Sequence, residues 1–116
     1  EKAPEQIEKI CKYLENHFFR NITLDELSLA AGFSKYYLLR TFTKVKGISP
    51  HKYLETVRIE KSKKMLEEGM PIIDIALKTG FTDQSHFTNL FKSLIGLTPK
   101  SYQKVIKEAG NMEGKV

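Results

Sequence analysis

The sequence lacks the features that mark secreted, membrane-spanning or disulfide-stabilised proteins. Its 116 residues include one cysteine, so an internal disulfide is impossible, and a single thiol fits a reducing cytosol. No apolar run approaches the roughly 20 residues of a membrane-spanning helix. The opening segment EKAPEQIEKICKYLE is charged and periodic, unlike a secretory signal. We therefore expect a cytoplasmic protein without membrane contact. Because the chain begins with Glu1 in place of Met, we also expect it to be part of a longer protein.

Motifs for catalysis and for metal binding are also missing. The histidines, His17, His51 and His86, stand far apart and lack metal-ligand spacing with cysteine or acidic residues. The sequence contains no nucleophile elbow, phosphate-binding loop or pair of catalytic carboxylates. Cys11 falls on an apolar helical stripe, which predicts a buried structural thiol rather than a reactive one. The sequence thus predicts no enzyme activity, no metal and no cofactor.

Positive charge is present, and it is concentrated in one part of the chain. The net charge is +5, and the segment from Lys35 to Leu66 holds nine lysine and arginine residues against two glutamates. This segment therefore carries +7 and the remainder −2. A basic block on a near-neutral domain suggests a polyanionic partner. A solvated helix face is the alternative that charge alone leaves open.

Hydrophobic spacing and capping residues predict an all-α protein of seven helices and no strands. The clearest start signals are the capping box Thr23-Leu-Asp-Glu26, the Ser34 cap and the Ser49-Pro50 pair. The tail from Asn111 to Val116 has no periodicity and is expected to be disordered. The predicted helices are about 5–19, 23–32, 35–46, 50–68, 72–79, a sixth from Thr82 or Asp83 to Gly96, and a seventh from Pro99 to near Gly110.

The chain also aligns with itself at an offset near 48 residues. In each copy two short helices are joined by a glycine turn, and a small residue, Ser28 or Ala76, stands four positions before that glycine. This is the pattern of a helix-turn-helix, and two copies make it far more specific than one. A duplicated hairpin that only builds a bundle is the alternative. The matching segments are LDELSLAAGFS (24–34) with IIDIALKTGFT (72–82), and LLRTFTKVKGISPHKY (38–53) with FTNLFKSLIGLTPKSY (87–102).

These repeats and the segment YLETVRIEKSKKML between them resemble the DNA-binding domain of the AraC/XylS family of bacterial transcription regulators, over roughly residues 5–105. The resemblance implies two helix-turn-helix subdomains, 1–49 and 69–110, joined by a linker helix, 50–68, with 111–116 as the disordered tail. It implies sequence-specific binding of double-stranded DNA, with the third and sixth helices in successive major-groove segments. It also implies RNA polymerase as a partner and a sensing or dimerisation domain outside this chain.

In the first predicted recognition helix, Leu38 and Phe42 face the core. The resemblance implies base contacts from the outer positions Tyr36, Leu39 and Arg40. Arg40 can bond guanine O6 and N7 in a bidentate way, with a phosphate or surface contact as the alternative. Leu39 cannot form a hydrogen bond, so it should favour a thymine methyl group, and Tyr36 can pack on sugar or bases.

In the second predicted recognition helix, Phe87 and Phe91 face the core. Many family members have arginine at the position of Asn89, so this chain departs from the family there. Glutamine and asparagine can pair with adenine N6 and N7, which predicts an A·T preference in the second half-site. The base-contacting residues expected on this helix are Gln84, Ser85, Thr88 and Asn89.

Contacts to the DNA backbone are expected from cationic and hydroxyl side chains beside the two recognition helices, and from capped helix N-termini. Three further cations, Lys61, Lys63 and Lys64, form either a solvated face of the linker helix or a surface for another protein. The expected backbone contacts are Ser34, Lys35, Thr43, Lys44, Lys46, Thr82, His86 and Lys92.

The length of the linker helix predicts a bent DNA complex. About 18 helical residues span about 27 Å, whereas one turn of B-DNA spans about 34 Å. If two readers on one face of the duplex fall short of a full turn, the DNA must bend towards the protein.

The main alternative to DNA binding is a protein-interaction module without DNA specificity. Such a module would not bind duplex DNA, whereas phosphate contacts make affinity fall steeply with salt.

Overall fold

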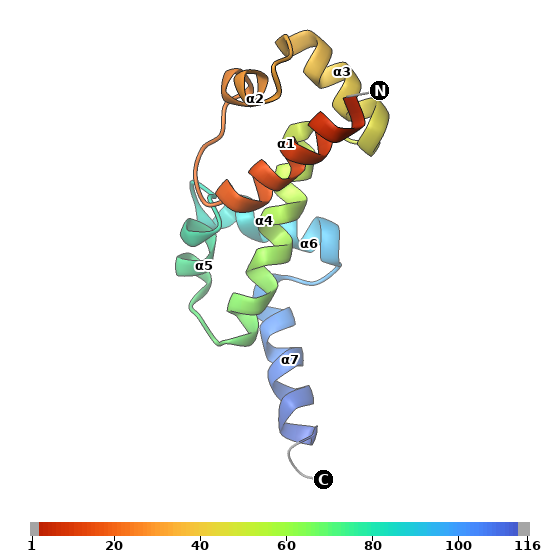
Figure 1. Cartoon of the computed structure of the whole chain (residues 1–116). Helices are drawn as coiled ribbons and strands as arrows, with labels where there is room; N and C mark the ends of the chain where they lie inside the picture. Colours follow the sequence, from red (N-terminus) through yellow and green to blue (C-terminus); the bar gives the residue numbers. More distant parts are fainter. Residues whose placement is uncertain (1–2, 114–116) are drawn as a thin grey trace. The chain divides into compact units, whose positions relative to one another are not determined.

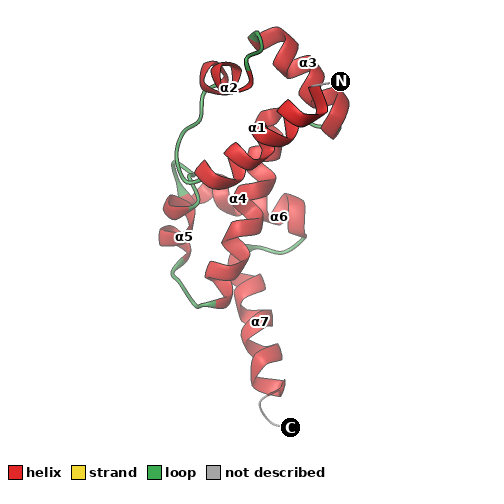
Figure 2. Cartoon of the chain, in the orientation of Figure 1, coloured by secondary structure: helices red, strands yellow, loops and turns green. Residues whose placement is uncertain are grey.

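The computed structural model of the chain describes residues 3–113. Within this range the fold contains seven α-helices and no strand, which confirms the predicted all-α class (Figure 1, Figure 2). The helices are α1 (Ala3–His17), α2 (Leu24–Ala31), α3 (Lys35–Lys46), α4 (Pro50–Glu67), α5 (Ile72–Lys78), α6 (Gln84–Ile95) and α7 (Pro99–Glu113).

Side-chain caps start the helices at most of the predicted positions. The Thr23 hydroxyl accepts a hydrogen bond from the Glu26 N–H at 3.1 Å, and Ser34 caps α3 in the same way through Tyr37 N–H at 3.2 Å. At α6 the sequence left Thr82 and Asp83 as alternatives, and the structure selects Asp83, whose carboxylate accepts from the His86 N–H at 2.8 Å. An aspartate at this position also places a negative charge at the positive end of the helix.

Glycine C-caps end α3 and α6 as predicted. Gly47 after α3 and Gly96 after α6 adopt left-handed conformations with φ of 82° and 94°, which other residues rarely tolerate. Gly110, in contrast, does not end α7, because the helix continues to Glu113. One glycine costs a helix about 1 kcal/mol relative to alanine, which lowers its stability without ending it. The predicted disordered tail is therefore helical at residues 111–113, and residues 114–116 lie outside the described range.

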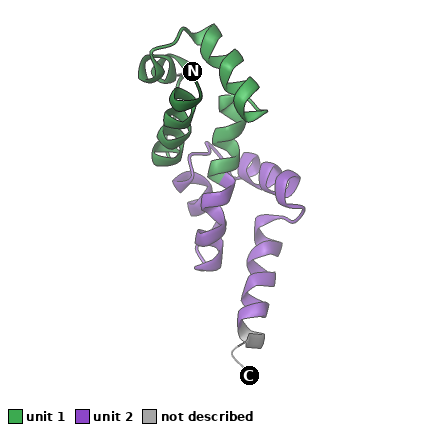
Figure 3. Ribbon diagram, turned by 45° about the vertical axis from the view of Figure 1, so that its right-hand side comes forward, with its two compact units in different colours: residues 1–58 green, residues 59–116 purple. Residues whose placement is uncertain are grey.

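The chain forms two compact units, residues 1–58 and 59–116 (Figure 3). In unit 1 the apolar stripe of α1 packs against α2 and α3, and Leu54 of α4 completes the core. Cys11 belongs to this core and is 1% exposed, in agreement with the predicted buried thiol. The buried core residues of unit 1 are Ile7, Ile10, Cys11, Leu14, Leu27, Ala31, Leu38, Phe42 and Leu54.

Unit 2 is built on a row of phenylalanine rings. Phe87 lies with its ring centroid 5.3 Å from that of Phe81 and 5.7 Å from that of Phe91, and all three side chains are buried. Aromatic rings bury large apolar areas, and tilted or edge-on contacts add to that stabilisation. The remaining buried apolar residues of this core are Ile59, Leu66, Ile75 and Ala76.

The internal repeat is visible in both units as the same turn and the same aromatic pair. Phe33 N–H donates to the Ser28 carbonyl at 3.2 Å, and Phe81 N–H donates to the Ala76 carbonyl at 3.0 Å. The exit of each copy is fixed by an edge-on ring contact, with centroids 5.7 Å apart in one unit and 5.4 Å apart in the other. These contacts join Phe42 to Tyr53 and Phe91 to Tyr102. Each unit is therefore a helix-turn-helix with its second helix backed by a buried phenylalanine.

Candidate nucleic-acid interface

The outer face of α3 carries the side chains that the sequence assigned to base reading. Leu38 and Phe42 are fully buried, which fixes the rotation of the helix about its axis. Tyr36 is consequently 70% exposed and Leu39 40% exposed, and Arg40 and Thr43 are also exposed. The structure therefore places the predicted readers of unit 1 on one accessible helix face.

Arg40 packs over the ring of Tyr36 on this face. The two residues are one helical turn apart, and the guanidinium carbon lies 5.9 Å from the ring centroid. A cation above an aromatic face is attracted to it, by about 0.5–1 kcal/mol at an exposed site. Tyr36 thus limits the orientations of the Arg40 side chain before any ligand arrives, an effect that the sequence pattern alone did not identify.

The lysines of α3 differ in how far they are occupied by contacts within unit 1. Lys35 pairs with Asp25 at 3.0 Å in an exposed ion pair, which dissociates at little cost. Lys46 is more firmly held, because its Nζ donates to Glu8 at 2.6 Å, and this hydrogen bond raises the pKa of Lys46. Lys44 is exposed. Of the three, Lys46 is the least available for a phosphate.

Leu39 forms part of the wall of an apolar hollow in unit 1. The hollow has a volume of about 240 Å³ and is also lined by the core residues Leu14, Leu27 and Leu54 and by Ser49, Pro50 and His51. A leucine at this position has apolar neighbours behind it and solvent in front. It offers a ligand an apolar surface, and its contact with a thymine methyl group stays a prediction.

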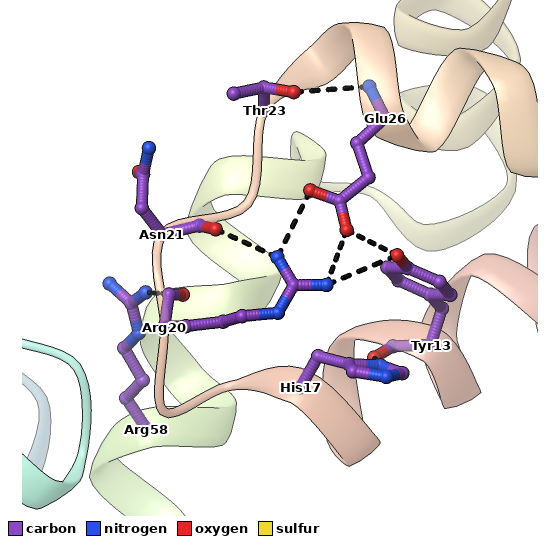
Figure 4. Close-up of polar contacts among 7 residues, drawn as sticks. All are labelled: Tyr13, His17, Arg20, Asn21, Thr23, Glu26 and Arg58. Atoms are coloured by element: carbon purple, nitrogen blue, oxygen red, sulfur yellow. Dashed lines mark hydrogen bonds and ion pairs between the residues drawn. The ribbon is translucent and has the colours of Figure 1, made fainter.

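A hydrogen-bonded cluster joins α1 and the connection that follows it to the first turn of α2 (Figure 4). Arg20 donates to both carboxylate oxygens of Glu26, in the first turn of α2, and to the Tyr13 hydroxyl at 3.2 Å. Tyr13 also donates to Glu26. The bonds from Arg20, and then from Tyr13, lower the pKa of Glu26 to about 2, with a smaller contribution from the Thr23 backbone. Glu26 is therefore ionised at neutral pH and ties α2 to the end of α1.

The outer face of α6 carries uncharged hydrogen-bonding groups. Phe87 and Phe91 are buried, and Gln84, Ser85 and Asn89 are exposed, whereas Thr88 is half-buried. His86 is exposed but packs edge-on against Phe81, with ring centroids 5.2 Å apart. Thr82 and Lys92 are also exposed, at the beginning of α6 and in its third turn.

Gln84 and Thr88 share a hollow with a cation that the sequence analysis missed. The hollow has a volume of about 370 Å³ and is lined by residues of α5, α6 and the beginning of α7, among them Thr98 and Lys100. The repeat aligns Lys100 with His51, which lines the hollow of unit 1. Lys100 and His51 therefore occupy matching positions in the two hollows.

Other kinds of site receive no support from the described residues. Within residues 3–113 no group of three or more histidine, cysteine or acidic side chains could hold a metal ion. In the same range no helix is both long and apolar enough to cross a membrane. Burial raises the pKa of the Cys11 thiol, which disfavours the reactive thiolate.

Comparison with known proteins identifies the family of this fold. A family model described as a helix-turn-helix domain matches residues 27–105, which run from within α2 through α6 and into α7. A solved structure described as a probable AraC family transcriptional regulator from Rhodopseudomonas palustris superposes with a TM-score of 0.82. It is 23% identical and covers 88% of this chain and 97% of its own. The family model covers more than half of the chain and is of the AraC type, so the chain belongs to the AraC/XylS family.

Two further structures have the same AraC-type fold. The C-terminal domain of AraT, a response regulator from Geobacillus stearothermophilus, is 28% identical with a TM-score of 0.80, covering 86% of this chain and 84% of that one. The DNA-binding domain of AdpA, solved with a target DNA, is 19% identical with a TM-score of 0.83, covering 89% of this chain and 94% of that one. At 19% identity the AdpA likeness concerns the fold alone.

The curated relatives of this AraC-type chain are longer proteins. The HTH-type transcriptional regulator YbfI of Bacillus subtilis is 52% identical over 82 residues, which are 71% of this chain and 30% of YbfI. AdaA of the same organism, described as a bifunctional transcriptional activator and DNA repair enzyme, is 34% identical over 110 residues, 92% of this chain and 52% of AdaA. The chain thus spans about a third to a half of the length of these two relatives.

Proposed function

We propose that this chain is the DNA-binding output domain of a bacterial transcription regulator, and that α3 and α6 read two adjacent major-groove segments. The observation that carries the proposal is the duplicated geometry of the two units. Leu38 and Phe42 of α3 are buried in unit 1, and Phe87 and Phe91 of α6 are buried in unit 2. These contacts fix the rotation of each helix about its axis, so that its opposite face is open to solvent. Family membership supports the same reading.

The two readers differ in chemistry and therefore in the bases they should prefer. On α3, Arg40 can form a bidentate contact to guanine, Leu39 can contact a thymine methyl group, and Tyr36 can pack on sugar or bases. On α6, the amides of Gln84 and Asn89 suit adenine. Ser85 and Thr88 supply hydroxyl groups that bond to several bases. The first half-site should therefore contain a guanine, and the second should be A·T-rich.

Contacts to phosphate fix the register of each unit without reading sequence. The exposed groups Lys44 and Lys92, together with Thr43, Thr82, His86 and the Ser34-capped N-terminus of α3, are the proposed contacts. Lys35 can join them by leaving its exposed pair with Asp25. Lys46 would have to give up Glu8, so its contribution should be smaller. Lys100, beside Gln84 and Thr88, is added to the proposal because it lines the same hollow.

The proposal assigns no catalytic step to this chain. AdaA, which contains a similar segment, is described as a DNA repair enzyme as well as an activator, but only 52% of AdaA is covered. Cys11 is 1% exposed with a raised pKa, which makes it a poor nucleophile. A sensing or dimerisation domain elsewhere in the full protein, RNA polymerase as a partner and a cytoplasmic location belong to the same proposal.

Selection of bound sequences from random duplex DNA, at a stated ionic strength, tests the proposed function. The expected product is a site with two half-sites about one helical turn apart, centre to centre. Affinity for the selected site should fall with a slope of roughly −0.9 per phosphate contact in a plot of log affinity against log salt. A protein-interaction module would enrich no sequence and would not bind duplex DNA at any salt concentration.

A further inference from the structure

Arg58 is a buried cation whose guanidinium is held by backbone carbonyls. It is 8% exposed; its Nε donates to the Phe18 carbonyl at 2.8 Å, and its Nη2 donates to the Arg20 carbonyl at 3.0 Å. Burial lowers the pKa of Arg58 from its ordinary value, partly opposed by the nearby Glu55. Burying a cation is costly, so an apolar side chain could fill this space with less desolvation. What the guanidinium adds is direction, because its planar fork fixes two bonds at set angles.

These two bonds connect α4 to the helix-turn-helix of unit 1. The carbonyls belong to the connection between α1 and α2, and the same Arg20 that accepts from Arg58 holds Glu26 of α2 (Figure 4). In turn α2 packs on α3, with Leu27 and Leu38 in one core. A continuous set of contacts therefore runs from Arg58 to the recognition helix of unit 1.

Arg58 also stands at the position where α4 passes from one unit to the other. It is the last residue of unit 1, and the next residue, Ile59, is buried in the core of unit 2. One turn earlier, Leu54 lies in the core of unit 1. The helix itself continues without a break from Pro50 to Glu67. How firmly unit 1 holds α4 therefore depends on Leu54, on Tyr53 and on the two directed bonds of Arg58. The Tyr53 ring lies edge-on to Phe42, and its hydroxyl donates to Glu15 at 2.7 Å.

We propose that Arg58 is a positioning residue that fixes α4 to unit 1 and thereby determines which spacing between two DNA half-sites the protein accepts. The inference rests on the proposed function, because it requires α3 and α6 to read separate half-sites. Two linked binding modules gain most when the link matches the distance between their sites. A link that is held firmly accepts one spacing, whereas a link with a loose attachment accepts several with lower affinity for each.

The test compares the selected site with versions that have one base pair inserted or removed between the half-sites. Wild type should lose about tenfold or more in affinity on either change, because joint binding of two modules can contribute about 10²–10⁴-fold. Arg58→Met keeps a long apolar stem but no donors. This variant should bind the selected site about 3- to 10-fold more weakly than wild type does. Its affinity should fall by a smaller factor than that of wild type when the spacing between the half-sites changes. Lys64→Met removes an exposed cation of the same helix and should keep the wild-type ratio between spacings.

The ratio of affinities separates positioning from a simple loss of stability. All measurements belong at a temperature where circular dichroism shows each variant to be folded. If Arg58→Met does not fold, Arg58→Lys replaces it, because lysine keeps the charge but lacks the planar fork. The quantity to measure is again the ratio of affinities for the selected site and for the sites with changed spacing. A variant that weakens every spacing by the same factor would overturn the inference. Wild type that shows no sequence preference at all would instead overturn the proposed function.

Discussion

Replacing Tyr36 with leucine should weaken DNA binding through Arg40 as well as through Tyr36 itself. The ring lies 5.9 Å from the guanidinium carbon, and Tyr36 is 70% exposed. Cation–π contacts extend to about 6 Å and contribute about 0.5–1 kcal/mol at exposed sites, so this one belongs at the lower end. The coupling between the two side chains should accordingly be about 2-fold in affinity, and at most about 5-fold.

A double-mutant cycle measures that coupling directly. Affinities for the selected site would be determined by fluorescence anisotropy for wild type, Tyr36→Leu, Arg40→Ala and the double variant. Arg40→Ala alone should cost about 1–3 kcal/mol and relax specificity at one base pair. Tyr37→Leu is the matched control, because this neighbouring tyrosine packs edge-on against Phe33 and not on Arg40.

The losses of binding free energy in Tyr36→Leu and Arg40→Ala should be less than additive in the double variant. If the free-energy changes of Tyr36→Leu and Arg40→Ala simply add, the ring does not prepare the guanidinium for binding. If Arg40→Ala weakens cognate and random DNA equally, Arg40 contacts phosphate and reads no base.

Three further outcomes are expected. A gel-phasing assay should show DNA bent towards the protein, because α4 has 18 residues and is shorter than a turn of duplex; straight DNA would refute this. Phe87→Ala should destabilise unit 2 by about 3–5 kcal/mol, since the ring is fully buried between Phe81 and Phe91; an unchanged melting curve by circular dichroism would contradict the core described for this unit. The pKa of Glu26 is lowered from 4.5 to about 2, so its contribution to stability is present above pH 4.5 and is lost as the pH falls towards 2. Glu26→Gln should therefore flatten the dependence of unfolding free energy on pH between 4.5 and 2. An unchanged slope in this range would exclude Glu26 as the source of the dependence.

Helix boundaries and the inward-facing residues were predictable because they depend on neighbours in sequence. The caps at Thr23 and Ser34 and the buried pair Phe87 and Phe91 follow from local hydrogen bonding and from helical spacing. The repeat identified both helix-turn-helix units because each copy carries the same turn. The length of α7 was underestimated, since a glycine at position 110 lowers helix stability without ending the helix.

The supporting contacts were not predictable, because they join residues that are distant in sequence. Arg58 was counted only as part of a basic block, whereas 40 residues separate it from the Phe18 carbonyl that it holds. Lys46 was expected to meet phosphate, and its bond to Glu8 spans 38 residues. No periodicity or local motif specifies which cation becomes buried. The base contacts of α3 and α6 likewise stay predictions, because exposure of a side chain does not show what it binds.

The central claim is that one chain reads two half-sites with two different chemistries. Sequence selection from random DNA, repeated with Arg40→Ala and with Asn89→Ala, tests it most directly. We expect Arg40→Ala to relax the preference for a guanine in one half-site. Asn89→Ala should relax the preference for an A·T pair in the other half-site, about one helical turn away. Loss of preference at the same base pair in both variants, or an unchanged selected sequence in either, would contradict it.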